Sequence, residues 1–192
     1  AASGLNAKLE LLRKADNQEE GYLEGTKQLL ADANPLGIDR STIQGTLAAA
    51  ISTPKDYRTA LEAVIRYAID ALLVRDQTAA VGILGQLAAK AGAPAKLMFV
   101  QTGNPDVGRR APDGSDCLLD HVTCDDATRP LAQRLFGHVV VVQTAAEAPH
   151  PIPEPLVYVT RDGIILRGNG SGEFWPAGSQ PGNPLARKHL IA

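Results

Sequence analysis

Residues 156–172, LVYVTRDGIILRGNGSG, decide how the rest of the chain is interpreted. Two short apolar runs, 156–160 and 164–166, flank the residues Arg-Asp-Gly at 161–163. An Asp-Gly pair between apolar runs is a strong hairpin signal, because glycine adopts the positive φ of a primed turn without a Cβ clash. The stretch therefore predicts two antiparallel strands joined by a tight turn.

Glycines at every second position follow this hairpin: Gly168, Gly170 and Gly172. Together with Gly163 they predict that a phosphate, a packed helix or another polypeptide approaches the main chain closely. A phosphate-binding loop needs a helix after the glycines, and the following EFWP at 173–176 predicts none. A packing turn or an interface between chains is the better interpretation.

The composition limits the classes of function. A chain of 192 residues with 44% hydrophobic residues suits one domain or two small ones. The net charge of −2 argues against a global basic field for nucleic acid, so any such contact needs a local patch. Two cysteines are too few for a disulfide framework, which favours a cytosolic protein. No signal peptide or apolar run of membrane-spanning length is recognised, and the first residue is not Met, which suggests a fragment of a longer protein.

Working outward from the hairpin, the chain contains an internal repeat. Residues 57–80, YRTALEAVIRYAIDALLVRDQTAA, are similar to residues 127–146, ATRPLAQRLFGHVVVVQTAA. Each copy predicts a helix, a strand and a helix start, and each is followed by a further strand. The Gly-, Pro- and Asp-rich residues 101–115 separate the copies. The order helix, strand, helix, strand therefore predicts two related α/β halves.

Four motifs in this order resemble the hinge domain of SMC (structural maintenance of chromosomes) ATPases. They are GYLEGTKQLL at 21–30, DYRTALEAVIRYAIDALLV at 56–74, VTRDGIILRGNG at 159–170 and NPLARKHLIA at 183–192. The resemblance implies an α+β fold with two pseudo-symmetric α/β subdomains and coiled-coil helical segments at both termini. The implied division is a coiled-coil end with a first helix at 1–34, subdomain I at 35–108, subdomain II at 109–184 and a returning helix at 185–192.

The function implied by the resemblance is architectural. A hinge dimerises and joins two coiled-coil arms into a V or ring around DNA in a chromosome condensation or segregation protein. The resemblance implies a homodimer with Gly163, Gly168, Gly170 and Gly172 at the interface, and condensin-type accessory subunits in the full-length protein. It implies no catalytic residue, metal or cofactor, since the ATPase lies in separate head domains, and no GxxxxGK[ST] loop occurs here.

The resemblance also implies weak DNA contact and a cytoplasmic, nucleoid-associated protein without membrane attachment. Two basic clusters are the candidate DNA-binding residues, because a few basic side chains suffice for salt-sensitive binding. The clusters are Arg109 with Arg110 and Arg187 with Lys188. Solvated surface charge is the plainer interpretation of both.

Alternative functions remain open. A small α/β enzyme would use a Cys–His pair from Cys117, His121 and Cys124. The same residues with Asp120 could ligate zinc, although the spacing is unusual for a zinc site. A stand-alone DNA-binding module is the third alternative. Trp175, the single tryptophan, fits either the core of the chain or a dimer contact.

Overall fold

The computed structural model describes residues 22–90, 92–101 and 110–178. Within this part of the chain, contacts divide the protein into two compact units. The first unit contains residues 22–49 and 68–98, and the second contains 50–67, 99–101 and 110–178. Segment 50–67, which the sequence division assigns to subdomain I, therefore packs with the second half of the chain. The predicted coiled-coil end at 1–21 and the returning helix at 185–192 fall outside the described residues, and the boundaries at 35, 109 and 185 stay predictions.

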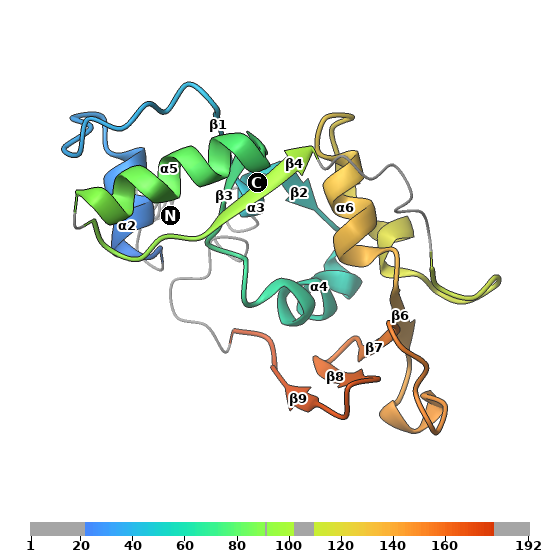
Figure 1. The fold of residues 1–192 in the computed structure, drawn as a ribbon. Helices are drawn as coiled ribbons and strands as arrows, with labels where there is room; N and C mark the ends of the chain where they lie inside the picture. The colour runs from blue at the N-terminus through green and yellow to red at the C-terminus, as the bar shows by residue number, and fades with distance from the viewer. Residues whose placement is uncertain (1–21, 91, 102–109, 179–192) are drawn as a thin grey trace, which may run out of the picture. The chain divides into compact units, whose positions relative to one another are not determined.

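The first unit combines short helices with an open sheet whose strand order is β1-β3-β4 (Figure 1). Its elements are α2 (Glu24–Leu30), β1 (Ile43–Thr46), α3 (Leu47–Ala50), β3 (Leu72–Asp76), α5 (Gln77–Ala89) and β4 (Leu97–Gln101). β1 and β3 are antiparallel, and α5 packs on β3. Asp76 begins α5 by accepting a hydrogen bond from the Ala79 N–H at 2.8 Å, as expected of an N-cap residue. The strand and the helix start predicted within the first copy of the repeat are thereby confirmed.

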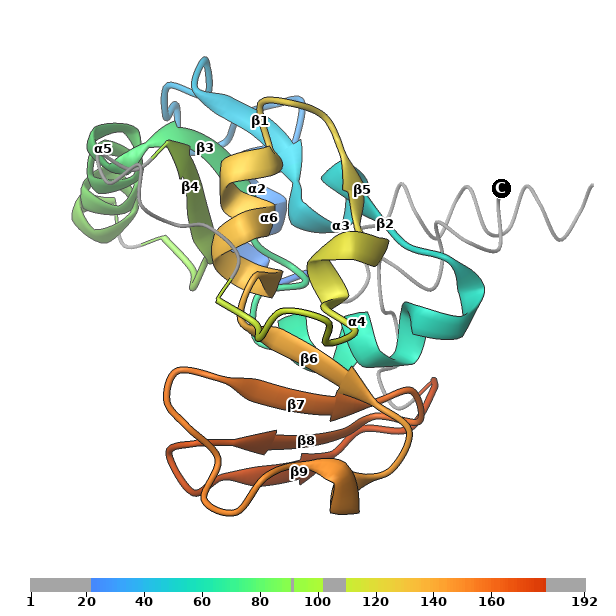
Figure 2. The ribbon, with the colours of Figure 1, turned by 90° about the vertical axis from the view of Figure 1, so that its right-hand side faces the viewer.

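The second unit is built around a four-stranded sheet. Its strands are β6 (Val139–Val142), β7 (Val157–Thr160), β8 (Ile164–Arg167) and β9 (Gly172–Phe174). Their order is β6-β7-β8-β9, with β6 parallel to β7 and the other neighbours antiparallel (Figure 2). The predicted hairpin is confirmed, whereas the strand β9 was not predicted from the sequence. β9 is the last strand, so one of its edges has no neighbouring strand in the sheet.

Segment 50–67 is attached to this second unit along its length. Its elements are β2 (Ile51–Ser52), the 3-10 helix η1 (Lys55–Tyr57) and α4 (Arg58–Ile65). β2 pairs with β5 (Thr123–Cys124), and α4 packs on β7 and β8. Leu61 and Ile65 of α4 are fully buried, so this helix, predicted as the first element of the repeat copy at 57–80, has an apolar face toward the interior.

The predicted repeat of element order is confirmed. The first copy runs α4–β3–α5–β4, and the second runs α6 (Arg129–Phe136), β6, η3 (Ala145–Glu147) and β7. The second helix of the later copy has shortened to the single turn η3. Another short turn, η2 (Leu118–His121), lies before α6. Because α4 belongs to one unit and β3 to the other, the two copies are not two separate bodies.

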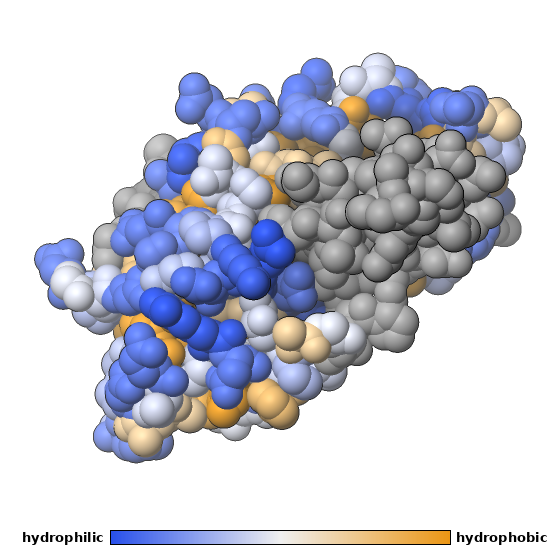
Figure 3. Space-filling model, turned by 180° about the vertical axis from the view of Figure 1, so that it is seen from behind, coloured by the Kyte–Doolittle hydropathy of each residue, from blue (hydrophilic) through white to orange (hydrophobic). Residues whose placement is uncertain are grey.

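The exposed surface carries few large apolar side chains. Among the described residues they are Tyr67, Val81, Leu84 and Phe174. On the face drawn in Figure 3, apolar atoms occur in small patches between hydrophilic ones. No helix in the described ranges has the length and apolar character needed to cross a bilayer.

Candidate functional site

The turn between β7 and β8 is a three-residue loop, residues 161–163. Gly163 has a φ of +100°, as expected for the Asp-Gly signal. The register pairs Val159 with Ile165, so the loop is one residue longer than a two-residue primed turn. Thr160 supports it, because its side-chain oxygen accepts the Ile164 N–H at 2.9 Å.

Two of the four predicted interface glycines are packed against their own chain. A Cβ at Gly163 would overlap the Trp175 carbonyl and lie 2.8 Å from its carbon. A Cβ at Gly168 would lie 3.0 Å from the Ile152 carbonyl oxygen and 3.1 Å from the Glu154 nitrogen. The small side chain at both positions is therefore explained by intrachain packing. Of the two interpretations that the sequence leaves open, a packing turn has support at these two positions, and their place in an interface stays a prediction.

The other two glycines, Gly170 and Gly172, lie in the turn before β9 and at the start of β9, the last strand of the sheet. Gly170 has a φ of +86° and no atom within 4 Å of an added Cβ. Gly172, the first residue of β9, would contact only the end of the Leu166 side chain, at 3.3 Å, and more distantly the Ile165 carbonyl. Phe174, also on β9, is 57% exposed. Among the described residues, β9 thus has one edge without a neighbouring strand and carries an exposed aromatic ring, features that favour pairing with another chain.

Trp175 follows β9 and is bound to its own subunit. Its N–H donates to the Gly163 carbonyl at 2.9 Å, and its indole Nε1 donates to Glu173 Oε2 at 2.7 Å. The guanidinium of Arg66 lies 3.2 Å from the centre of the ring, within cation–π distance. The hydrogen bond from Trp175 lowers the pKa of Glu173, with Arg167 lowering it further. Of the two interpretations of this tryptophan, packing within the chain has direct support.

Asp116 and His121 form a polar cluster with Tyr57, not a cysteine site. His121 Nε2 lies 2.6 Å from Asp116 Oδ1, and the Tyr57 hydroxyl donates to Asp116 Oδ2 at 3.0 Å. The rings of Tyr57 and His121 stack with their centres 3.6 Å apart. Arg161 from the hairpin loop donates to the Tyr57 hydroxyl at 2.9 Å. Together these contacts fasten segment 50–67 to the second unit.

The cysteines do not join this cluster as a nucleophile or zinc site. Cys117 is fully buried, and its thiol donates toward the Phe136 carbonyl at 3.5 Å. Burial raises the pKa of the half-buried Cys124 thiol, which disfavours a reactive thiolate. The described residues include no group of three or more His, Cys, Asp or Glu side chains placed to hold a metal. The Cys–His enzyme and the zinc site therefore lack structural support.

The predicted basic residues are mostly beyond what the structure describes. Arg109, Arg187 and Lys188 lie outside the described residues. Arg110 is exposed, and its backbone N–H donates to the Gly137 carbonyl at 2.7 Å. Their role in DNA contact stays a prediction. The sequence reasoning missed Phe174 and Glu173 as functional residues, because the short segment after Gly172 carries no local strand signal.

Comparison with protein families gives one match. The sequence profile described as SMC proteins Flexible Hinge Domain matches residues 40–150, which is more than half of the chain. Comparison with curated protein sequences finds no match.

Solved structures with the same fold include hinge domains of SMC proteins. The asymmetric dimer of the Geobacillus stearothermophilus SMC hinge domain has 21% identity and a TM-score of 0.76 over 98% of this chain and 78% of that chain. The Pyrococcus furiosus SMC protein hinge domain has 20% identity and a TM-score of 0.60 over 86% of this chain and 87% of that chain. The folded elbow of cohesin has 17% identity and a TM-score of 0.72 over 97% of this chain and 29% of that chain. At these identities the likeness establishes the fold.

Proposed function

Since the chain belongs to the family of SMC flexible hinge domains, we propose that it dimerises and joins two coiled-coil arms. A solved hinge domain of the same fold is an asymmetric dimer, which supports the proposal that this chain also associates with a second copy. The role is architectural, so the relevant quantity is the affinity of one copy for another.

The open edge of β9 is the observation that carries this proposal. A sheet edge exposes unpaired N–H and C=O groups, and an added strand satisfies them. Here the edge also holds Phe174, 57% exposed in the single chain, next to Glu173 and after Gly172. An aromatic side chain at the centre of an interface is typical of residues that dominate binding. We place Gly170 and Gly172 at this contact, where the main chain is most accessible.

The complementary surface is an edge of the sheet β1-β3-β4 in a second copy. The outer strands of that sheet are β1 and β4. Each copy can therefore contribute β9 from its second unit and one outer strand, β1 or β4, from its first unit. If β9 of one copy pairs with the first-unit sheet of the other, two equivalent contacts close a two-fold dimer. This arrangement follows the family pattern in which one half of a hinge meets the other half of its partner.

Phe174→Glu tests the interface, with Val81→Glu as the control. Both residues are exposed apolar side chains, at 57% and 63%, but Val81 lies on α5, away from the sheet edges. We expect Phe174→Glu to weaken the dimer by about 30-fold or more, the effect of losing an interface residue worth about 2 kcal/mol. Analytical ultracentrifugation over a micromolar concentration series measures this, and circular dichroism checks folding.

Two results would contradict the proposal. One is a wild-type chain that stays monomeric throughout the micromolar range. The other is a folded Phe174→Glu variant that dimerises as tightly as Val81→Glu. Gly168→Glu is a poor substitute for this test, because an added Cβ would lie 3.0 Å from the Ile152 carbonyl oxygen, so a weaker dimer would not separate an interface effect from altered packing within the subunit.

The wider role is proposed on the basis of the family. In the full-length protein the hinge would hold two arms in a V or ring around DNA, with ATPase heads and condensin-type subunits at the far ends. Weak DNA contact through Arg109, Arg110, Arg187 and Lys188 belongs to the same proposal, as does a nucleoid location. Salt-dependent DNA binding that is lost when these four residues are neutralised would support the contact.

A further inference from the structure

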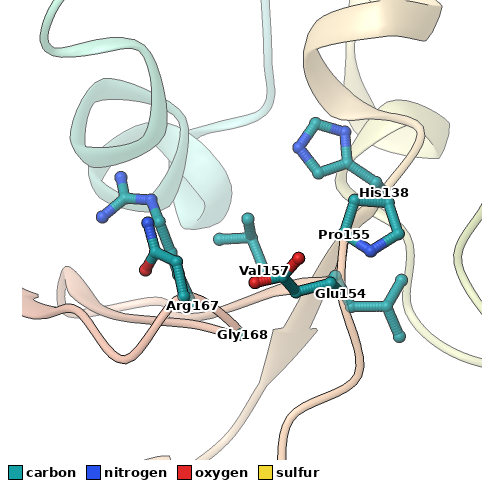
Figure 4. Close-up of a pocket in the computed structure, with 8 residues that line it drawn as sticks. His138, Glu154, Pro155, Val157, Arg167 and Gly168 are labelled. Atoms are coloured by element: carbon teal, nitrogen blue, oxygen red, sulfur yellow. The ribbon is translucent and has the colours of Figure 1, made fainter.

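A pocket of about 320 Å³ lies beside β7 and the end of β8, within the second unit. It is lined by His138, Glu154, Pro155, Leu156, Val157, Arg167, Gly168 and Asn169 (Figure 4). In the close-up, Arg167 and His138 stand on opposite sides, with Glu154 and Val157 between them. This volume is near the lower end for small-molecule sites. The pocket is separate from the outer edge of β9.

Arg167 is held in place by groups outside the pocket. Its NH1 group pairs with Glu173 Oε1, while Trp175 donates to the other carboxylate oxygen at 2.7 Å. The Arg167 side chain is 24% exposed, so it is partly desolvated. Because the pair occupies NH1, the remaining N–H groups of the guanidinium are available to a ligand. Guanidinium groups bind phosphate through several parallel hydrogen bonds.

The guanidinium groups of Arg110 and Arg167 make the His138 side of the pocket electropositive. Burial is the main cause that lowers the pKa of His138, and the two guanidinium groups lower it further. A hydrogen bond to the Arg134 backbone opposes these effects. A bound anion would compensate the two guanidinium charges and favour the imidazolium form, so its binding would be coupled to proton uptake.

Glu154 and Asn169 add a carboxylate acceptor and an amide group to the lining of the pocket. The exposed carboxylate of Glu154 accepts hydrogen bonds from hydroxyl groups and repels a second anion. The Asn169 side-chain oxygen accepts the Ser171 N–H at 3.0 Å and the Ser171 hydroxyl at 2.8 Å. These bonds leave its amide nitrogen as a donor, and Asn169 lines the pocket together with Arg167. A ligand with one anionic group and several hydroxyl groups fits this lining better than a ligand with a chain of phosphodiesters.

We propose that the pocket binds a phosphate monoester of a sugar, with the phosphate between Arg167 and His138 and a sugar hydroxyl on Glu154. Two sources carry this chemistry: a small phosphorylated sugar and the 5′ end of a nucleic acid strand. The site lies within one unit and does not depend on dimerisation.

Proton NMR of the His138 ring tests the binding, with His138→Gln used to assign its signal among the four histidines of the chain. The probes are ribose 5-phosphate and a 5′-phosphorylated thymidine tetramer. We expect at least one to shift the His138 signal saturably and raise its pKa, whereas ribose does not. The tighter probe identifies the source. No saturable shift with either probe, or an equal shift with ribose, overturns the proposal.

Variants give an independent test. Arg167→Gln and Asn169→Asp should each weaken the probe about tenfold or more, because each removes or opposes a charge-assisted hydrogen bond. Arg129→Gln, a change at an exposed arginine elsewhere in the same unit, should leave binding unchanged. Asn169 is exposed, so Asn169→Asp keeps the test valid if Arg167→Gln unfolds. Unaltered affinity in folded Asn169→Asp overturns the assignment, as does equal binding of a tetramer with a 5′-hydroxyl end.

Discussion

Gly163→Ala tests whether the glycine requirement in the hairpin is intrachain. An added Cβ would overlap the Trp175 carbonyl and approach the Thr59 side chain to 3.2 Å. It would also force alanine to a φ of +100°. Trp175 must then move away, which breaks its 2.9 Å hydrogen bond to the Gly163 carbonyl and loosens the end of β9.

Two contributions set how much Gly163→Ala lowers the free energy of unfolding. A left-handed backbone conformation costs an L-residue about 1–2 kcal/mol. Loss of one backbone hydrogen bond adds about 1 kcal/mol. We therefore expect Gly163→Ala to lower the free energy of unfolding by about 2–3 kcal/mol.

Gly170→Ala is the matched control. Gly170 also has a positive φ, +86°, but no atom lies within 4 Å of an added Cβ. Its alanine variant should lose only the conformational contribution, about 1–2 kcal/mol. Urea unfolding measures the free energy of unfolding of both variants, with fluorescence of the single tryptophan, Trp175, as the local probe. Equal losses in the two variants would refute the intrachain explanation.

Three further outcomes are expected. The pKa of Glu173 lies below its ordinary value of 4.5, so its stabilising contribution is complete above that pH and is lost as the pH falls through the folded-state pKa. Trp175 fluorescence should change over this acid range, and Glu173→Gln should abolish that change. A thiol reagent should modify half-buried Cys124 before unfolding and fully buried Cys117 only on unfolding; equal rates would argue against the packing of Cys117. Asp116→Asn should lower the free energy of unfolding by about 1–2 kcal/mol in a urea titration, because the carboxylate joins a tyrosine and a histidine. An unchanged midpoint would show that this cluster contributes no stability.

The elements with local signals were predictable from the sequence. The helix α5 has an Asp N-cap and ends at Ala89, and the N–H of Gly92 just beyond it donates to the Leu87 carbonyl at 2.8 Å. The hairpin has Asp-Gly between apolar runs. β9 has no such signal, because three residues between a glycine-rich turn and a proline form a strand only through pairing with β8. Phe174, the main residue of the proposed contact, was missed for the same reason.

The role of the glycines was only partly predictable. A glycine indicates that another group lies close to the backbone, but it does not say which group. At Gly168 the neighbour is the proline-rich loop at Ile152 and Glu154, separated by more than ten residues of intervening chain. The spacing of Cys117, His121 and Cys124 was equally ambiguous. The intervening turn directs one thiol into the core and the imidazole toward Asp116, an orientation that sequence separation does not specify.

The attachment of segment 50–67 to the later half of the chain has a consequence for synthesis on the ribosome. The buried face of α4 includes Leu61 and Ile65, yet β7 and β8, on which it packs, end about 100 residues after it. At translation rates of about 5–20 residues per second, that face waits roughly 5–20 s for its binding surface. A nascent chain of this protein therefore exposes an apolar helix throughout that interval, which makes α4 a natural client for a ribosome-associated chaperone.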